Sequence, residues 1–237
     1  MSTDYRPGQD TRHLFDRIAP RYDLLNRLLS FGIDRRWRRA AVRALGLSGT
    51  GRVLDAATGT GDVALAIAAA YSQVEIAGLD LSANMLRGAV PKLASARGRI
   101  FFVQGSCENL PLTDATFDGA VIAFGIRNVL RREVALREFF RVLKPGARLV
   151  VLEFSQPTRP LLAGLYRWYS RKILPHVGGL LSDGAAYRYL PDSVEAFPAR
   201  KDFLAMMEKA GFRCLGHQDL TGGIVTLYCG CRPPGML

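Results

Sequence analysis

The sequence has little of what marks membrane-spanning, disulfide-linked or metal-binding proteins. The longest apolar stretch of its first half, Val63–Tyr71, is about half as long as a membrane span requires. Its four cysteines show no paired spacing typical of a disulfide framework or a zinc site, so we interpret them as buried or incidental thiols. The three histidines are scattered, and no metal site is predicted. Residues 1–20 carry charges throughout and do not resemble a signal peptide, so we expect a soluble, cytoplasmic protein.

Acidic residues are fewer than basic ones. The chain has 21 Asp and Glu against 32 Lys and Arg, a net charge of +11. A basic protein binds nucleic acid, anionic lipid or an acidic substrate, or simply carries a solvated basic surface, and charge alone does not choose among these. The 237 residues, 49% of them hydrophobic, fit one α/β domain with a large core better than two domains.

From residue 51 onward, apolar runs typical of buried strands alternate with helical patterns. The predicted strands are Arg52–Ala56, Val74–Leu79, Ile100–Val103, Phe117–Phe124, Arg148–Phe154, Phe212–Gln218 and Ile224–Cys229, the last two forming a hairpin. The predicted helices are Asp62–Tyr71, a helix capped by Ser82 that runs to about Ala96, Arg132–Leu143 stopped by Lys144-Pro145-Gly146, and Ala199–Lys209 closed by Gly211. Such alternation predicts a parallel sheet covered by helices on both faces.

We interpret residues 1–237 as a single domain with four parts. These are an N-terminal helical segment (11–45), a cofactor-binding core (51–154), an insertion (155–200) and a C-terminal helix with a hairpin (201–230). In the first part, Asp34 is predicted to cap a helix that Gly46 ends. The insertion contains a predicted helix around Leu161–Leu174 and a stretch rich in Gly, Tyr and Pro, and we expect it to form a lid or substrate wall.

The most informative local feature is the turn Asp55-Ala56-Ala57-Thr58-Gly59-Thr60-Gly61-Asp62, between the first predicted strand and helix. Its glycines allow the backbone to turn tightly and to approach a ligand. Nicotinamide dinucleotides and S-adenosylmethionine (SAM) both use this geometry. Asp62 would repel a diphosphate, and Ala64 stands where the dinucleotide fingerprint has its third glycine. Asp55 and Asp62 instead suit the sulfonium and ammonium cations of SAM, although a turn without a ligand is the alternative.

Other SAM contacts are expected where the remaining strands end, because ligands of open α/β sheets bind at the carboxyl ends of the strands. Asp80 ends the second strand, where its carboxylate can accept hydrogen bonds from both ribose hydroxyls. Ser106 and Cys107 follow the third strand and should lie near the adenine. Phe124 and Gly125 follow the fourth, where glycine permits close approach.

Four segments resemble the MenG/UbiE family of quinone-biosynthesis C-methyltransferases: Tyr22–Ser30 with Trp37, Ala123–Val129, Arg141–Ser155 and Ser182–Leu190. The likeness covers residues 11–230 or nearly so. It implies a class I SAM-dependent methyltransferase (Rossmann-like) fold, with a mostly parallel seven-stranded sheet and an antiparallel C-terminal strand. The family's SAM contacts map to Thr58, Asp80, Ser106 and Cys107. The chain departs from the family pattern at Asp34, Ser106, Ala123 and Ala147, which affects individual adenine contacts rather than the fold.

The resemblance implies methyl transfer from SAM to a ring carbon of demethylmenaquinol, giving menaquinol. A ubiquinol precursor, alone or in addition, is the alternative acceptor, and we favour demethylmenaquinol because Ala56-Ala57-Thr58 is more similar to the menaquinone-type members. A ring carbon becomes nucleophilic once a hydroquinone hydroxyl loses its proton. The protein must therefore supply alignment, a route for the proton and a dry pocket, without a metal.

Arg127, Tyr22 and Asn26 are the predicted catalytic residues, with Asp23, Asn128 and Tyr187 as further polar candidates. Arg127 should lie beside the reacting methyl group, where it would stabilise a phenolate or hold a water, since arginine itself is not a plausible base. The alternative for Arg127 is a structural salt bridge. For Tyr22 and Asn26 the alternative is capping and packing of the N-terminal segment.

Three rival functions stay open on the sequence alone. The chain could methylate another lipid or small molecule, such as a phospholipid amine. It could methylate nucleic acid, but it lacks an Asn-Pro-Pro-Tyr-like motif and Cys229-Gly230-Cys231 lies too late for a cytosine nucleophile, so no nucleic-acid partner is predicted. It could also bind SAM without catalysis, as part of a biosynthetic complex.

The implied substrate, a prenylated hydroquinone, lives in the bilayer, so a chain without a spanning segment must meet it at the membrane surface. Residues 11–45 mix an apolar stripe with nine arginines, and Trp37 lies among them as expected of a residue in the headgroup layer. We therefore predict peripheral contact with the inner face of the cell membrane. The alternative is that the stripe packs on the catalytic core and the arginines are solvated. A homodimer is also compatible with the sequence.

Overall fold

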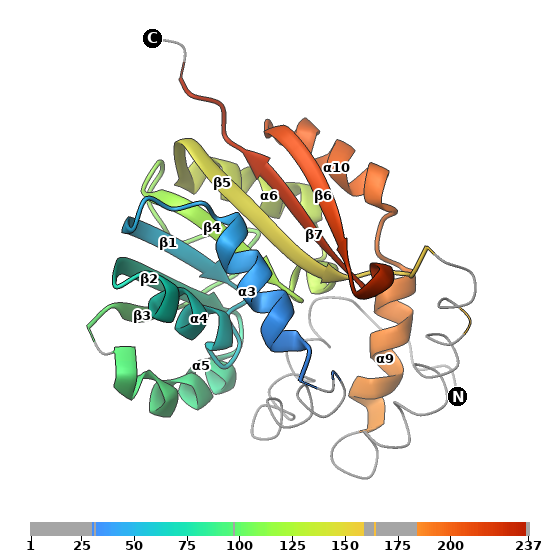
Figure 1. Ribbon diagram of the computed structural model, residues 1–237, viewed down its shortest axis with the longest axis horizontal. Helices are drawn as coiled ribbons and strands as arrows, with labels where there is room; N and C mark the ends of the chain where they lie inside the picture. Colours follow the sequence, from blue (N-terminus) through green and yellow to red (C-terminus); the bar gives the residue numbers. More distant parts are fainter. Residues whose placement is uncertain (1–29, 31, 97, 159–163, 165–183, 236–237) are drawn as a thin grey trace.

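The computed structural model of the chain describes residues 30, 32–96, 98–158, 164 and 184–235. Its centre is a seven-stranded sheet with the order β3-β2-β1-β4-β5-β7-β6 (Figure 1). The strands are β1 (Thr50–Ala56), β2 (Gln73–Asp80), β3 (Ile100–Gln104), β4 (Phe117–Ala123), β5 (Leu143–Phe154), β6 (Arg213–Leu220) and β7 (Val225–Cys231). Strands β1 to β5 pair in parallel, and β7 runs antiparallel to both β5 and β6. The predicted sheet and its C-terminal hairpin are therefore confirmed.

Helices cover both faces of the sheet (Figure 1). They are α3 (Asp34–Ala44), α4 (Asp62–Ala70), α5 (Ala83–Ala89), α6 (Arg132–Val142), α9 (Gly184–Glu195) and α10 (Arg200–Lys209), with 3-10 turns η2 (Val90–Ala96), η3 (Ile126–Asn128) and η5 (Thr221–Gly223). Val42 of α3 and Ile67 of α4 belong to one buried cluster, and Phe139 of α6 and Phe203 of α10 belong to the other. The strands contribute to both clusters because successive strand side chains point to opposite faces.

The order of the strands creates the crevice in which a ligand can bind. Strands β1 and β4 are neighbours in the sheet although β2 and β3 lie between them in sequence. The connection after β1 leads to α4 on one face, and the connection after β4 leads to α6 on the other. The two loops diverge at this switch point and leave space at the carboxyl ends of the strands.

Two helix boundaries differ from the prediction. Ile33, not Asp34, is the N-cap of α3, and Asp34 lies in its first turn, where its carboxylate accepts hydrogen bonds from Ser30 and Arg38. Ser82 caps α5 as predicted, since its Oγ accepts the Met85 N–H at 3.1 Å. The α-helix ends at Ala89 and continues as the 3-10 turn η2. Pro91 explains the early end, because it has no N–H to donate to the preceding turn.

Helix α6 ends at Val142, so the predicted stop before Lys144-Pro145-Gly146 is confirmed, but these three residues already lie inside β5, which begins earlier than the predicted Arg148. Leu143 pairs with Phe117, and the ladder to β4 resumes only at Arg148 opposite Gly119. A proline is tolerated at such an irregularity because no ladder hydrogen bond is required there.

Parts of the sequence prediction lie outside the described residues: nearly all of the pattern over 11–45 before Asp34, and nearly all of the helix expected around Leu161–Leu174. Helix α9 occupies the end of the predicted insertion, and Pro191 lies within it. No helix in the described part of the chain is both long and apolar enough to cross a membrane.

Candidate SAM-binding site

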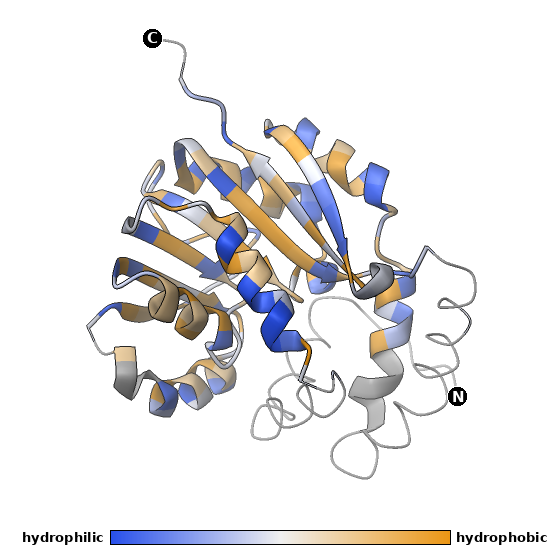
Figure 2. Cartoon of the chain, viewed as in Figure 1, coloured by the Kyte–Doolittle hydropathy of each residue, from blue (hydrophilic) through white to orange (hydrophobic). Residues whose placement is uncertain are grey.

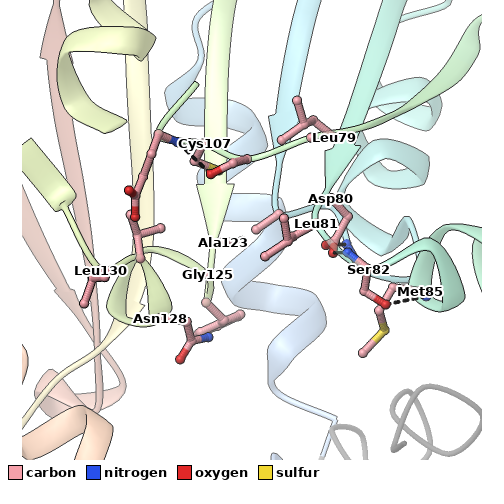
Figure 3. Close-up of a pocket in the computed structure, with 17 residues that line it drawn as sticks. Leu79, Asp80, Leu81, Ser82, Met85, Cys107, Ala123, Gly125, Asn128 and Leu130 are labelled. Carbon is pink, nitrogen blue, oxygen red and sulfur yellow. Dashed lines mark hydrogen bonds between the residues drawn. The ribbon is translucent and has the colours of Figure 1, made fainter. Parts of the chain in front are cut away.

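A pocket opens at the carboxyl ends of the central strands, where the sequence places the cofactor (Figure 3). In the view of Figure 3, Asp80, Leu81 and Ser82 lie on one side and Asn128 and Leu130 on the other. The described residues that line it are Ala57, Gly59, Leu79, Asp80, Leu81, Ser82, Met85, Gly105, Ser106, Cys107, Glu108, Ala123, Phe124, Gly125, Asn128, Val129 and Leu130. Of the predicted SAM contacts, Gly59, Asp80, Ser106 and Cys107 are therefore brought together.

Asp80 is held in place by the loops on both sides of it. One carboxylate oxygen accepts the Gly59 N–H at 2.8 Å, and the other accepts the Ser82 N–H at 2.8 Å. Each oxygen of a carboxylate can accept about two hydrogen bonds, so a carboxylate in this position suits a ligand that presents two neighbouring donors. Vicinal ribose hydroxyls are such donors, and the two oxygens are already oriented by the backbone.

Close backbone approach shapes the floor of the pocket. A Cβ atom added to Gly125 would lie 2.5 Å from the Cβ of Ala57, so only glycine fits between the ends of β1 and β4. Ala57 and Phe124 both have positive φ, 50° and 58°, which is uncommon for residues with a side chain. Such strained residues often mark functional sites, and here both line the pocket. Periodicity in the sequence carries no signal for these conformations.

The wall formed after β3 contains a thiol that carries no charge. Cys107 is buried, and burial together with the nearby charge of Asp80 raises the pKa of its thiol to about 12. Cys107 is therefore a neutral thiol at physiological pH and not a nucleophile. Leu79, Leu81 and Met85 complete an apolar slot suited to a flat aromatic base.

The charges around the pocket fit SAM and disfavour a dinucleotide. Asp80 and Glu108 are the charged side chains among the described lining residues, and no lysine or arginine is among them. A diphosphate needs cations or a free helix N-terminus, whereas the sulfonium and ammonium groups of SAM are cations. Asp62 in the first turn of α4 forms ion pairs with Lys92 at 2.9 Å and Arg38 at 3.3 Å. Asp62 therefore places a negative charge at the N-terminus of α4, which disfavours a phosphate there, although its side chain does not line the pocket.

Asp55, Thr58 and Gly61 lie behind the pocket wall. The Thr58 hydroxyl donates to Asp55 Oδ2 at 2.5 Å, and Asp55 also accepts the backbone N–H of Ala64 in the first turn of α4. Burial raises the pKa of Asp55 to about 7 despite these two hydrogen bonds. Gly61 has φ of 80° and ends the loop as the N-cap of α4. These residues support the glycine-rich loop and are not among the residues that line the pocket.

Arg127 is placed in a buried ion pair rather than in the pocket wall. Its guanidinium lies 2.8 Å from Glu153 Oε1 and also donates to the Phe124 carbonyl, while its N–H donates to Glu153 Oε2 at 3.2 Å. Arg127 is 8% exposed and Glu153 is fully buried. Glu153 was missed at the level of sequence because a single carboxylate in an apolar strand gives no indication of its partner.

The other predicted catalytic residues cannot be compared with the pocket. Tyr22, Asp23 and Asn26 lie outside the described residues, and of Tyr187 only the backbone, within α9, is described. Their roles stay predictions. Asn128 does line the pocket, on the turn that follows β4 (Figure 3).

The fold and the pocket define the class of this protein: it is a class I SAM-dependent methyltransferase. Solved structures agree on the fold. The [4+2]-cyclase SpnF has a TM-score of 0.73 at 18% identity, covering 97% of this chain and 98% of its own. A SAM-dependent methyltransferase from Thermotoga maritima has a TM-score of 0.62 at 22% identity, covering 93% of this chain and 99% of its own.

The family model for the ubiE/COQ5 methyltransferase family matches residues 4–232, and the chain belongs to that family. It is 76% identical to a "Ubiquinone/menaquinone biosynthesis C-methyltransferase UbiE" of Syntrophotalea carbinolica, over 98% of each chain. It is 49% identical to a "Demethylmenaquinone methyltransferase" of Thermus thermophilus, over 93% of this chain and all of the relative. The family resemblance inferred from the four sequence segments is confirmed.

Proposed function

We propose that this enzyme methylates a ring carbon of demethylmenaquinol and releases menaquinol. The observation that carries the proposal is the naming of its relatives. Two relatives, at 49% and 45% identity, are named for demethylmenaquinone, and the relative at 76% identity is named for both quinones. Menaquinone is common to all three names. A demethylated ubiquinol precursor is the second candidate, favoured by the double name of the most similar of these three relatives.

The site supports this reaction through binding and exclusion of water. SAM, when bound, supplies a methyl group on a positively charged sulfur. Asp80 would hold the ribose hydroxyls, and the slot of Leu79, Leu81 and Met85 would hold the base. The acceptor ring would enter on the side of Phe124 and Asn128, at the carboxyl end of β4. Alignment in a dry pocket supplies much of the rate, because the methyl group is already activated.

The test is turnover by the purified enzyme with SAM and each reduced acceptor in separate reactions. We expect a methyl group on a ring carbon of demethylmenaquinol. Methylation of the ubiquinol precursor alone would replace the first candidate with the second, and methylation of neither would end the proposal. In a deletion strain, mass spectrometry of the quinones should detect a demethylated quinone, and its ring type identifies the natural acceptor.

Arg127 is proposed to act on the acceptor side of the site through Phe124. The Phe124 N–H donates to the Leu152 carbonyl at 2.7 Å, and its carbonyl accepts from Arg127, so both ends of this strained residue are fixed. Glu153 in turn fixes Arg127. The Phe124 ring contacts Phe154, with 4.6 Å between ring centroids. Arg127 and Glu153 are therefore positioning residues in this proposal, not catalytic ones.

Two variants separate positioning from mere stability. Removing one partner of a buried ion pair destabilises the fold because the other charge is left buried and unpaired, so the test replaces both charges. We expect the double variant Arg127→Met/Glu153→Gln, in which the amide oxygen still accepts backbone N–H groups, to fold and to bind SAM normally, yet to turn over about 10- to 100-fold more slowly because Phe124 loses its anchor. Phe124→Leu should raise the KM for the acceptor without changing SAM affinity. Wild-type turnover by the double variant would reduce Arg127 to a structural role.

Contact with an anionic membrane surface is proposed for the outer face of α3. Arg35, Arg36, Arg39 and Arg43 are exposed, and at about 100° per residue they fall within one face of the helix. Figure 2 shows strongly hydrophilic residues along α3, with more apolar residues between them. Trp37 does not belong to this surface: it is 6% exposed, packs against Phe124 and Phe154, and donates to Thr221 Oγ1 at 2.8 Å. The prediction of Trp37 in the headgroup layer was therefore wrong.

A further inference from the structure

Strands β6 and β7 bring two thiols together at the end of the sheet opposite the cofactor pocket. All four cysteines are free, and Cys214 is exposed while Cys231 is half-buried. Cys214 lies near the start of β6, and Cys231 ends β7, which is its hydrogen-bonded neighbour (Figure 1). Cys231 also pairs with Arg148, six residues before the carboxyl end of β5, whereas the pocket lies where the parallel strands end.

A bulge explains why these thiols meet. Arg213 pairs with Cys231 and Gly216 pairs with Cys229, so two residues of β6 oppose the single residue Gly230 of β7. Cys214 is one of the two and has φ of 52°, a conformation that residues with side chains rarely adopt. A Cβ atom on Gly230 would meet Leu215, Met207 and Phe212, so that face of the hairpin is filled. Cys231 points to the other face, where the bulge brings Cys214 beside it, and the nearby Cys214 thiol adds to burial in raising the pKa of Cys231.

We propose that Cys214 and Cys231 form a reversible dithiol–disulfide pair, oxidised by a low-molecular-weight disulfide. Cys214, the exposed thiol, attacks as the thiolate and forms a mixed disulfide while one small thiolate leaves. The Cys231 thiolate then attacks the Cys214 sulfur, the intramolecular S–S bond forms, and the second small thiolate leaves. The protons of the two cysteines end on the two released thiols. The protein loses two electrons, and the small disulfide gains them.

Cys229 is the matched control within the same strand. It lies two residues before Cys231 and therefore on the same face of β7, but its partner in β6 is Gly216. Both thiols are half-buried, and burial raises the pKa of each, but Cys229 has no cysteine opposite it in β6, whereas Cys231 lies beside the bulge that contains Cys214. Disulfides in a reducing compartment are typically transient and redox-sensing, which fits a pair at an exposed sheet edge.

The experiment treats the folded, full-length enzyme with oxidised glutathione, blocks the remaining thiols, and maps disulfides by mass spectrometry. We expect the loss of two hydrogen atoms, a peptide link between Cys214 and Cys231, and its reversal by a small dithiol. The link closes a covalent loop and should raise Tm by about 5–10 °C. Cys229→Ser should keep both effects, and Cys214→Ser or Cys231→Ser should abolish them. A persistent glutathione adduct on Cys214, a link to Cys229, or no oxidation of the folded enzyme would each overturn the proposal.

Discussion

Asp55 shows how one buried side chain can support the cofactor loop without lining the pocket. Its carboxyl group accepts the Thr58 hydroxyl and the Ala64 N–H, so it links β1, the glycine-rich loop and the start of α4. Burial raises its pKa to about 7, and the negative charge of Asp80 acts in the same direction. The protonated and ionised forms are therefore both populated near neutral pH, which makes this residue a source of pH dependence.

The free energy of unfolding should reflect this titration. A carboxyl with a raised pKa in the folded state keeps its proton between pH about 4 and 7, where the unfolded chain has lost it, so stability falls as pH rises through that range. Asp55→Asn should remove this fall, by up to about 4 kcal/mol at pH 8. Chemical denaturation at pH 5 and pH 8 measures it.

A control variant isolates this effect from other carboxyl groups. Hydrogen bonds and ion pairs lower the pKa of Asp118, Glu138 and Asp219 in spite of burial. These groups therefore change the free energy of unfolding in the opposite direction, because their contribution to stability is lost as pH falls below about 4. They are present in both proteins and cancel in the difference. Asp202→Asn makes the same substitution at an exposed position of α10 and serves as the comparison. Parallel profiles for wild type and Asp55→Asn would contradict the prediction.

Asp80 carries the prediction for cofactor affinity. Asp80→Ala removes the acceptors for the ribose and frees the Gly59 and Ser82 N–H groups, so SAM binding should weaken by about 1–3 kcal/mol. Calorimetry with the folded variant measures the change. Glu75→Ala removes the same charge from an exposed position of β2, where the carboxylate pairs with Arg52, and should leave affinity unchanged. Equal effects of the two variants, or tighter binding of NAD than of SAM to the wild type, would exclude the assigned site.

At the scale of elements, the junction of β1 and β4 is fixed by one glycine. The Cβ atom of Gly125→Ala would lie 2.5 Å from Ala57 Cβ, which belongs to a backbone segment and cannot rotate away. The ends of the two strands must separate, and Ala57 lines the pocket. We expect a loss of about 1–3 kcal/mol of stability and a measurable loss of SAM affinity.

Gly88→Ala is the matched variant for this junction. Its Cβ atom would find only Thr60 Cγ2, at 3.7 Å, which is ordinary contact. Because Gly88 lies inside α5, alanine there should stabilise the fold slightly, by about 0.5–1 kcal/mol. Thermal melting and SAM titration compare a position where the added Cβ atom clashes with one where it does not. Equal stability and equal SAM affinity of the two variants would show that the junction of β1 and β4 accommodates the added methyl group.

At the scale of the whole molecule, the excess of positive charge should matter most for membrane contact on the outer face of α3, where exposed arginines lie close together. Replacing Arg35, Arg36, Arg39 and Arg43 with Gln should reduce flotation with anionic liposomes, and the wild-type signal should fall with salt. Arg38 is excluded from the set because it pairs with Asp34 and Asp62. A control with the same loss of charge replaces the exposed residues Arg87, Arg137, Lys201 and Lys209. Equal flotation of the two variants would show that membrane binding depends on net charge and not on the position of these arginines. Flotation with neutral lipid would exclude the proposed contact with an anionic surface.

Local sequence determined the elements and the position of the cofactor. The alternation of strands and helices, the loop around Gly59 and the carboxylate of Asp80 at a strand end each depend on residues near one another in the chain. Parallel strands bring their carboxyl ends to one edge of the sheet, so these local features are enough to predict where the pocket lies. The boundaries that were wrong, at Asp34 and at the start of β5, are places where contacts from distant segments decide between competing local preferences.

Only the tertiary structure decided which partner each of several side chains would find. Arg127 and Glu153 are 26 residues apart in sequence, and Trp37 meets Phe124 and Phe154 only because α3 packs over the ends of β4 and β5. Cys214 reaches Cys231 because a bulge shifts the register of β6. The physical reason is common to all three. Periodicity reports which face of an element is buried, whereas the partner on that face depends on sheet order and register, which residues far apart in the chain set together.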